Sequence, residues 1–216
     1  MTILKRGSRG EAVKQIQEAL HLLPDGIFGA MTEERVKEFQ RDNGLTADGI
    51  VGPATLARLI PIRFKKSKRT ITDIVVHCTA TKAGKDFTVT EIRAMHKARG
   101  FSDIGYHYLV RLDGRIEPGR DVDVIGAHVS GHNSHSIGVS YVGGLDASGK
   151  AKDTRTENQK NALLNLLMML RKLYPKATIS GHRDFSPDKN GNGIVEPSEW
   201  IKDCPCFDAR KEYAAV

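Results

Sequence analysis

The sequence predicts an α/β protein, with a mixed β-sheet and flanking helices preceded by a small all-α domain of three helices. Two observations support this prediction. Residues 1–62 contain an internal repeat bordered by apolar residues at helical spacing, and residues 71–216 alternate between β-branched segments and helix-start signals. Residues 63–70 are expected to be a basic linker between the two domains. The chain of 216 residues, with 39% hydrophobic content, is long and apolar enough for packed cores.

The repeat in residues 1–62 consists of two Asp-Gly turns, each followed by a helix start. Asp25-Gly-Ile-Phe-Gly-Ala-Met-Thr32 recurs as Asp48-Gly-Ile-Val-Gly-Pro-Ala-Thr55. We expect Thr32 to cap one helix, and Pro53 suits the first turn of the next. Three short helices around a small core follow from this pattern. The apolar residues at helical spacing around the first copy are Val13, Ile16, Leu20, Val36 and Phe39.

Strand and helix signals alternate in the second domain. Strands are expected at residues 74–76, 106–118, 136–142 and 178–182, the second of these being a hairpin that turns at Asp113-Gly114. Thr88 with Glu91, and Thr156 with Gln159, are capping-box signals that begin two helices. The order strand, helix, hairpin, strand, helix, strand predicts a mixed sheet with helices packed against it.

Three side chains of the second domain have the chemistry of a zinc site. His77 lies in an apolar run, His182 follows the last expected strand, and Cys204 lies in a Cys-Pro-Cys segment. Two imidazoles and one thiolate leave a fourth position for water, which is the pattern of catalytic rather than structural zinc. Cys78 and Cys206 are interpreted as ordinary thiols, since the Cys204 to Cys206 spacing is too short for an easy disulfide.

Short motifs run in one order across residues 71–208. They are Val76-His-Cys-Thr-Ala-Thr81, Glu91-Ile-Arg-Ala-Met-His-Lys97, Gly105-Tyr-His107, Gly119-Arg-Asp121, Gly126-Ala-His-Val-Ser-Gly-His-Asn133, Ser136-Ile-Gly-Val139, Gly143-Gly144 and Lys202-Asp-Cys-Pro-Cys-Phe-Asp208. In these motifs the chain resembles the zinc-dependent N-acetylmuramoyl-L-alanine amidases, the family of the amidase-type phage lysozymes and the peptidoglycan recognition proteins.

This resemblance implies specific roles in the second domain, 71–216, which is then a zinc amidase catalytic domain. The implied zinc ligands are His77, His182 and Cys204, and the implied catalytic partners are Tyr106 and Lys202. Both partners would stabilise negative charge on the carbonyl oxygen during attack by water. His128 and Asn133 are expected on the substrate side or next to the metal ligands, and a structural turn is an equally good interpretation of Asn133.

Residues 1–62 resemble the three-helix peptidoglycan-binding domain found at the ends of many bacterial and phage wall hydrolases. The motifs that carry the resemblance are Arg6-Gly-Ser-Arg-Gly-Glu-Ala-Val-Lys-Gln-Ile-Gln17, Asp25-Gly-Ile-Phe-Gly29, Phe39-Gln-Arg-Asp-Asn-Gly-Leu45 and Asp48-Gly-Ile-Val-Gly-Pro-Ala-Thr55. The resemblance implies bacterial peptidoglycan as the partner. The structural alternative is a helical dimerisation or spacer domain.

The segment between His182 and Cys204 fits the twelve-residue EF-hand loop, which would make calcium a second metal. Its oxygen donors would be Asp188, Asn190, Asn192, Ile194 through its carbonyl, Glu196 and Glu199. Pro197 lies inside the loop, and the Asp-Gly-Asn composition also describes an ordinary turn. A calcium loop and a surface turn therefore remain alternatives.

The net charge of +7 comes mainly from the linker, because residues 61–70 hold five basic and no acidic side chains. A nucleic-acid site would need a basic stripe on a folded element, so we expect a solvated linker and no nucleic-acid partner. There is no signal peptide and no apolar run of membrane-spanning length. We therefore expect a monomer that is made in the cytoplasm, does not insert into membranes and acts on the wall after release.

Together these features predict an endolysin-like peptidoglycan hydrolase. It would cleave the amide between N-acetylmuramic acid and the L-alanine of the stem peptide. The alternatives are a bacterial autolysin or muropeptide-recycling amidase, and a non-catalytic peptidoglycan sensor. Wall-binding motifs argue against recycling, and Cys204 argues against a sensor that has lost its metal ligand.

Overall fold

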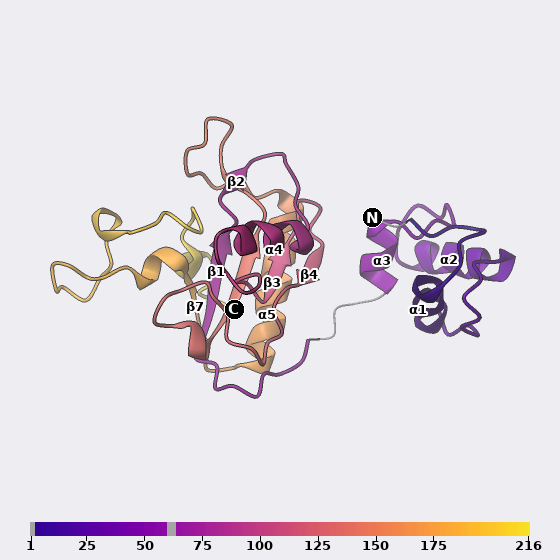
Figure 1. The fold of residues 1–216 in the computed structure, drawn as a ribbon, viewed down its shortest axis with the longest axis horizontal. Coiled ribbons are helices and arrows are strands. Elements are labelled where there is room, and N and C mark those ends of the chain that lie inside the picture. Colours follow the sequence, from indigo (N-terminus) through magenta and orange to yellow (C-terminus); the bar gives the residue numbers. More distant parts are fainter. Residues whose placement is uncertain (1–2, 60–63) are drawn as a thin grey trace. The chain divides into compact units, whose positions relative to one another are not determined.

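The computed structural model describes residues 3–59 and 64–216. The chain divides into two compact units, Met1–Arg63 and Phe64–Val216, which are drawn in Figure 1. The first unit contains the helices α1 (Glu11–Ala19), α2 (Ala30–Asp42) and α3 (Pro53–Leu59), so the predicted three-helix domain is confirmed. Its core is formed by the buried residues Leu4, Val13, Ile16, Leu20, Phe28, Val36, Val51 and Leu59.

The two copies of the repeat are held by the same hydrogen bonds. The Nε2 group of Gln17 donates to the carboxylate of Asp25 at 2.8 Å and to the hydroxyl of Thr32 at 3.2 Å. The matching bonds of the second copy join Gln40 to Asp48 and Thr55. Each glutamine is buried and ties its own helix to the turn that follows.

The expected capping role of Thr32 is wrong. Helix α2 begins at Ala30 and is preceded by Gly29, which makes no side-chain cap. Thr32 is the third residue of the helix, where it is buried and accepts the bond from Gln17. A buried amide needs a partner, and this tertiary bond takes the hydroxyl that local capping would have used.

The second unit is built on a five-stranded sheet of order β4-β3-β5-β1-β7. Strands β3, β5, β1 and β7 run parallel to one another, and β4 is antiparallel to β3, so the predicted mixed sheet is confirmed. A separate pair joins β2 to β6. The strand bounds are β1 (Asp73–Cys78), β2 (Thr81–Lys82), β3 (Tyr108–Val110), β4 (Ile116–Pro118), β5 (Ser136–Tyr141), β6 (Gly144–Leu145) and β7 (Thr178–Gly181).

Two long helices cover this sheet. Helix α4 (Val89–Ala98) and helix α5 (Glu157–Leu173) begin with the expected capping boxes, at Thr88 and Thr156 respectively. In Figure 1, α4 lies in front of the strands and α5 behind them. Every residue of β5 is buried, as expected for a strand covered on both faces. No helix within residues 3–59 and 64–216 is long and apolar enough to cross a membrane.

The remaining helical segments of the second unit are short. They are the 3₁₀ turns η1 (Asn133–His135), η2 (His182–Phe185) and η3 (Pro197–Glu199), and helix α6 (Ala209–Glu212). The long connection between β7 and α6 contains η2 and η3, and it also carries Lys202 and Cys204. The third metal-ligand candidate therefore comes from an irregular segment rather than from the sheet.

In the basic segment in front of β1 the lysines at 65, 66 and 68 are exposed, as expected, but Ser67 and Arg69 pack on the second unit. Ser67 is buried and donates its hydroxyl to the carbonyl of Val122 at 2.7 Å. The guanidinium of Arg69 donates to backbone carbonyls of residues 122, 133, 134 and 136. Lys65 pairs with Asp121 and Asp123. Residues 65–69 thus behave as part of the folded unit, and Arg63 lies outside the described residues.

Candidate metal centre and active site

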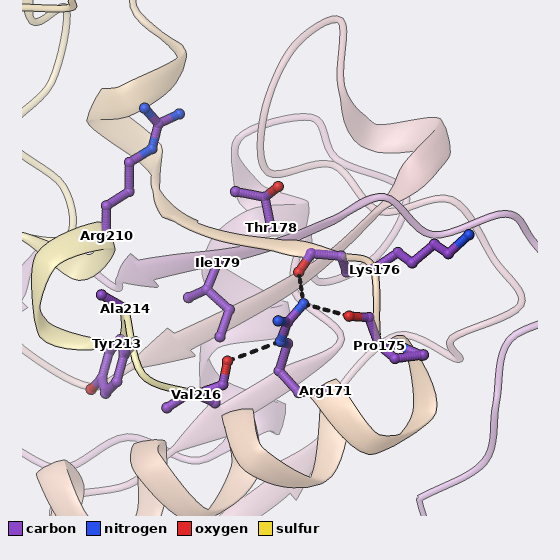
Figure 2. A pocket seen from close by; sticks show the side chains of 10 residues that line it. Arg171, Pro175, Lys176, Thr178, Ile179, Arg210, Tyr213, Ala214 and Val216 are labelled. Carbon is purple, nitrogen blue, oxygen red and sulfur yellow. Dashed lines mark hydrogen bonds between the residues drawn. The ribbon is translucent and has the colours of Figure 1, made fainter.

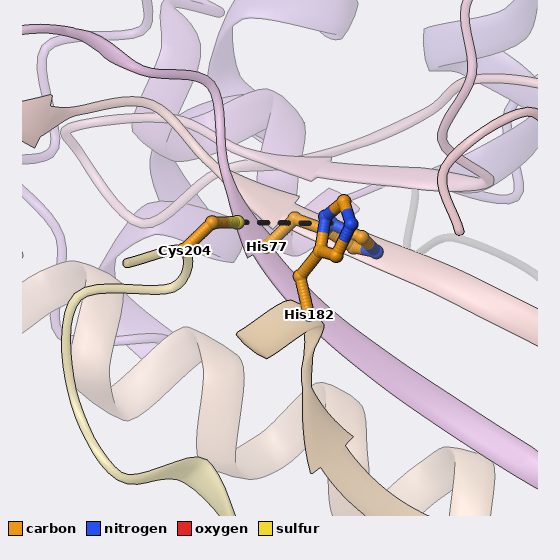
Figure 3. A group of neighbouring side chains, drawn as sticks. All are labelled: His77, His182 and Cys204. Carbon is orange, nitrogen blue, oxygen red and sulfur yellow. Dashed lines mark hydrogen bonds between the residues drawn. The ribbon is translucent and has the colours of Figure 1, made fainter. Parts of the chain in front are cut away.

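The two histidines predicted as metal ligands lie side by side at the ends of neighbouring strands. Strands β1 and β7 are parallel, and Val76 is paired in register with Gly181. His77 directly follows Val76, and His182 directly follows Gly181, so the register brings their imidazoles together. Their Nδ1 atoms lie 3.1 Å apart, and Figure 3 shows the side chains of His77, His182 and Cys204 grouped together.

Cys204 completes the group from the irregular segment after η3. Its Sγ atom lies 3.7 Å from Nδ1 of His77 and accepts the backbone N–H of Cys78 at 3.2 Å. Within residues 3–59 and 64–216, His77, His182 and Cys204 form the one set of three such residues whose ligand atoms all lie within 4.8 Å of one another. With metal bonds of about 2.0–2.3 Å, two nitrogens and one sulfur at these separations fit a tetrahedral zinc site with one open position.

Burial keeps both histidines ready to bind a metal. It lowers the pKa of His77 well below its ordinary value, and the neighbouring His128 and His182 add to this effect. Burial, followed by the charge of Lys202, lowers the pKa of His182 to about 4. Both imidazoles are therefore neutral near pH 7, which is the protonation state that metal binding requires.

The thiol of Cys78 does not compete for the metal at neutral pH. Its neighbour Cys204 is the main cause that raises the pKa of Cys78 to about 12. Cys78 is buried behind the strand end, while its backbone N–H points at the sulfur of Cys204. The strand end thus gives the sulfur of Cys204, and not that of Cys78, a backbone hydrogen-bond donor on the side of His77.

His128 contacts the far side of the ring of His77. Its Nδ1 lies 3.0 Å from Nε2 of His77, and its own Nε2 lies 3.3 Å from the hydroxyl of Ser136. That hydroxyl donates to the carbonyl of His132 at 2.8 Å. A metal on Nδ1 of His77 leaves the proton on Nε2, which then donates to His128, and His128 donates in turn to Ser136. This chain of bonds is consistent with one tautomer at each ring.

Asn133 has the structural role that the sequence left open. Its Oδ1 atom accepts the backbone N–H groups of His128 at 2.8 Å and Val129 at 2.9 Å. The amide therefore shapes the turn that presents His128 to His77. Asn133 also lines a cleft of about 370 Å³ beside the metal candidates, together with His128, His182 and Lys202.

The two predicted catalytic partners differ in their surroundings. The ring of Tyr106 lies 5.3 Å from that of His77, and its hydroxyl points toward the carbonyl of Cys78 at 3.5 Å. Burial raises the pKa of Tyr106, so the phenol stays a proton donor. Lys202 is exposed at the edge of the cleft. The structure thus brings a neutral donor and a cation to the group from different elements.

The twelve-residue segment proposed for calcium is folded through its own hydrogen bonds. Both carboxylate oxygens of Asp188 accept backbone N–H groups, from Gly191 and Gly193. The buried Glu199 accepts three more, from residues 189, 190 and 196. Within the described residues, the carboxylates of this segment do not form a set of three ligands within 4.8 Å. Calcium binding here therefore stays a prediction.

A second hollow, of about 460 Å³, contains none of the predicted site residues. It lies where α5, the start of β7 and the end of the chain meet, as Figure 2 shows. The guanidinium of Arg171 donates to the carbonyls of Pro175, Ala177 and Val216. This arginine ties the end of the chain to α5, which is a structural role.

Three contacts around the site were missed from the sequence. They are the contact of His128 with His77, the packing of Arg69 on the turn near Asn133, and the contact of Cys78 with Cys206. Each joins residues that are far apart in the chain, and no local pattern marks them. The odd cysteine count was the one available signal for the last of these contacts.

Comparison with protein families agrees with the two units. A family described as a peptidoglycan binding domain matches residues 9–59. A family described as N-acetylmuramoyl-L-alanine amidase matches residues 67–197. The second match includes His77 and His182 and ends before Cys204, which enters the group through the tertiary structure.

Relatives and solved structures are consistent with these matches. The endolysin of Enterobacteria phage K11 is 43% identical over 150 residues, covering 69% of this chain and 89% of the relative. The endolysin of Escherichia phage T7 is 37% identical over the same shares. The Ph2119 endolysin from a Thermus scotoductus bacteriophage has a TM-score of 0.53 at 27% identity, covering 70% of this chain and 88% of that one. By sequence match and fold, the chain belongs to the N-acetylmuramoyl-L-alanine amidase family.

Proposed function

We propose that His77, His182 and Cys204 hold one zinc ion, and that this chain is an endolysin-type amidase delivered to the wall by its first unit. The reaction of the family is cleavage of the amide between N-acetylmuramic acid and L-alanine in peptidoglycan. The observation that carries the zinc proposal is the set of two Nδ1 atoms and one sulfur within 4.8 Å at the edge of a cleft. The donor set fits zinc with one position left open.

When bound, zinc would lower the pKa of a water molecule toward neutrality and polarise the scissile carbonyl. Tyr106 and Lys202 are the side chains by which the protein itself would stabilise the reacting carbonyl group. The phenol of Tyr106 donates a hydrogen bond, and the ammonium of Lys202 adds positive charge, where the carbonyl oxygen becomes negative. His128 holds the ring of His77 in place through the bond at its Nε2.

The cleft itself limits the choice of proton carrier. Its lining residues include no Asp or Glu, so no carboxylate is assigned as a general base. His128 and Asn133 line the cleft together with His182. We infer that Asn133 contacts the substrate through its amide nitrogen, which the turn does not use, and that His128, whose two ring nitrogens contact His77 and Ser136, acts next to the metal ligands.

For delivery, we propose the division 1–62 for wall binding, 63–70 for the connection and 71–216 for catalysis. The match of residues 9–59 to a peptidoglycan binding domain supports the first part. The similarity to the endolysins of phages K11 and T7 supports action on the host wall, and we propose that the chain reaches the wall after synthesis in the cytoplasm. The contacts of residues 65–69 with the second unit mean that a catalytic fragment should begin before them.

The zinc proposal is tested by replacing each ligand with alanine. His77→Ala, His182→Ala and Cys204→Ala should each lower the zinc content and abolish release of stem peptides from purified walls. Mass analysis of the fragments from the parent protein should show a free lactyl group and a free L-alanine amine. Full lysis by Cys204→Ala at normal zinc occupancy would overturn the ligand assignment.

Delivery is tested separately with two fragments. Residues 64–216 should cleave soluble muropeptides, and residues 1–62 should sediment with walls without cutting them. If residues 1–62 bind no peptidoglycan, the first unit is a spacer and the delivery proposal fails, while the zinc proposal stands on its own data.

A further inference from the structure

Two thiols that the zinc proposal does not use lie in contact beside the metal candidates. The Sγ atoms of Cys78 and Cys206 are 3.8 Å apart, although 128 positions separate the residues in the chain. Both are free cysteines; Cys78 is buried and Cys206 is half-buried. Each is a close neighbour of a proposed ligand, since Cys78 follows His77 and Cys206 lies two residues after Cys204.

The backbone around the pair is shaped for this contact. Cys206 has a φ of 72°, in the left-handed region that a residue with a Cβ rarely adopts. Its backbone N–H donates to the carbonyl of Asp203 at 2.7 Å, which closes the turn around Cys204. Gly144 faces the pair, and a Cβ there would lie 2.4 Å from the sulfur of Cys78. A side chain at this glycine would therefore push the two sulfurs out of their place.

We propose that Cys78 and Cys206 form a disulfide on exposure to a disulfide oxidant, and that this bond fastens the loop of Cys204 to the end of β1. The sulfurs need to approach from 3.8 Å to bonding distance, which a rotation of the side chains can supply. Cys204 is left out of the bond, because its sulfur faces His77 and accepts the N–H of Cys78.

The chemistry balances with oxidised glutathione as the oxidant. The half-buried Cys206 attacks one glutathione sulfur, which forms a mixed disulfide and releases one reduced glutathione. The buried Cys78 then attacks the sulfur of Cys206 and expels the second glutathione. Two protein thiols are oxidised, one glutathione disulfide is reduced, and the two thiol protons end on the two glutathione thiols.

The bond would be a covalent cross-link that encloses most of the second unit in one loop. A cross-link between residues so far apart in the chain restricts the unfolded chain strongly. It would also join the two segments that carry His77 and Cys204. The biological consequence rests on the proposed function: the thiols would stay reduced in the cytoplasm and become paired in an oxidising compartment at the wall.

The test uses the full chain loaded with zinc, with oxidised glutathione at about pH 8.5, where thiolates form more readily. Peptide mapping by mass spectrometry should find the Cys78 peptide joined to the Cys206 peptide, with zinc content unchanged. The melting temperature of the second unit should rise by about 5–15 °C and return on reduction with dithiothreitol. Cys206→Ser is the matched control and should show neither the joined peptide nor the rise.

A bond that includes Cys204 with loss of zinc, or a glutathione adduct on Cys206 alone, would overturn the proposal. A Cys78–Cys206 bond without a rise in melting temperature would contradict the proposed stabilisation of the second unit by this disulfide. The Cys204→Ala variant separates this result from the zinc proposal, because the pair should still form in it. None of these measurements depends on activity, so their results can be interpreted even if the proposed function is wrong.

Discussion

The Nε2 atom of His77 lies 3.0 Å from Nδ1 of His128, so one imidazole orients the imidazole that faces the proposed metal. Histidine ligands usually donate this second nitrogen to a carboxylate, a backbone carbonyl or water. A neutral imidazole can replace these acceptors only if its own proton sits on the other nitrogen. Ser136 favours this tautomer of His128, because its hydroxyl accepts a hydrogen bond from the N–H group at Nε2 of His128.

The first prediction concerns this orienting bond. His128→Leu removes the acceptor and should weaken zinc binding by about 10–100-fold, as for other residues that hold a metal ligand in place. His128→Asn keeps an acceptor near the position of Nδ1 and should retain most of the affinity. Competition with a chromogenic chelator measures both values. Equal zinc affinity in the parent and the leucine variant would contradict the orienting role.

The second prediction separates chemistry from metal binding at Tyr106 and Lys202. Tyr106→Phe and Lys202→Met should each lower kcat on a soluble muropeptide by about 10²–10³-fold, because each removes a group that stabilises the developing oxyanion. Zinc content should stay at the parent level, since neither residue belongs to the ligand set. Unchanged kcat in both variants would remove these residues from the mechanism.

The third prediction concerns Arg69. Its guanidinium donates to the carbonyl of Val122 and to three carbonyls, of residues 133, 134 and 136, that follow the turn presenting His128. Arg69→Met should lower the free energy of unfolding by about 2–3 kcal/mol, because partly buried carbonyls lose their donors. Lys66→Met, at an exposed position of the same segment, is the control and should change stability little. Urea unfolding of residues 64–216 measures both, and equal stabilities would show that the segment is only a linker.

The fourth prediction is a loss of stability in mild acid that involves His107. Its Nδ1 accepts the N–H of Gly138 at 2.9 Å, its Nε2 faces the carbonyl of Val124 at 3.1 Å, and burial lowers its pKa to about 4. The unfolded chain takes up this proton near pH 6.5. The contribution is therefore complete above about pH 6.5 and is lost as pH falls toward 4, by at most about 3 kcal/mol.

This pH dependence is measured by urea unfolding at a series of pH values between neutrality and mild acid. In His107→Gln the free energy of unfolding should fall less steeply with decreasing pH than in the parent. The other buried histidines contribute to the slope in both proteins, so the difference between the two curves is the quantity to compare. Parallel curves would contradict the assignment to His107.

The fifth prediction concerns the segment from Asp188 to Glu199. If it binds calcium, the melting temperature should rise with free calcium, by linkage equivalent to about 2.7 kcal/mol at one hundred times the dissociation constant. The rise should vanish in the variant that combines Asp188→Ala with Glu199→Gln. Melting curves with millimolar calcium and with a calcium-selective chelator make the comparison. No shift in the parent would leave the segment as a turn closed by its own backbone bonds.

Local signals in the sequence predicted local structure well. Thr88 and Thr156 begin α4 and α5 as expected, because a capping box needs only residues three positions apart. Thr32 failed as a cap because its hydroxyl is taken by Gln17, which lies fifteen positions away in the chain. The packing of Arg69 within the basic segment was not predicted for a similar reason, since its partners come from more than fifty residues later.

The sequence by itself determined the order of the elements, the donor atoms of a zinc site and the resemblance to the amidases, because these depend on residue types and short spacings. The tertiary structure alone decided which of these groups meet. The parallel register of β1 and β7 sets the two Nδ1 atoms 3.1 Å apart, and the turn held by Asn133 directs His128 to His77. The contact of Cys78 with Cys206 likewise depends on how the last segment returns to β1. Such contacts close loops of many tens of residues, and the packing of the whole sheet, rather than any local preference, supplies the free energy that closes them.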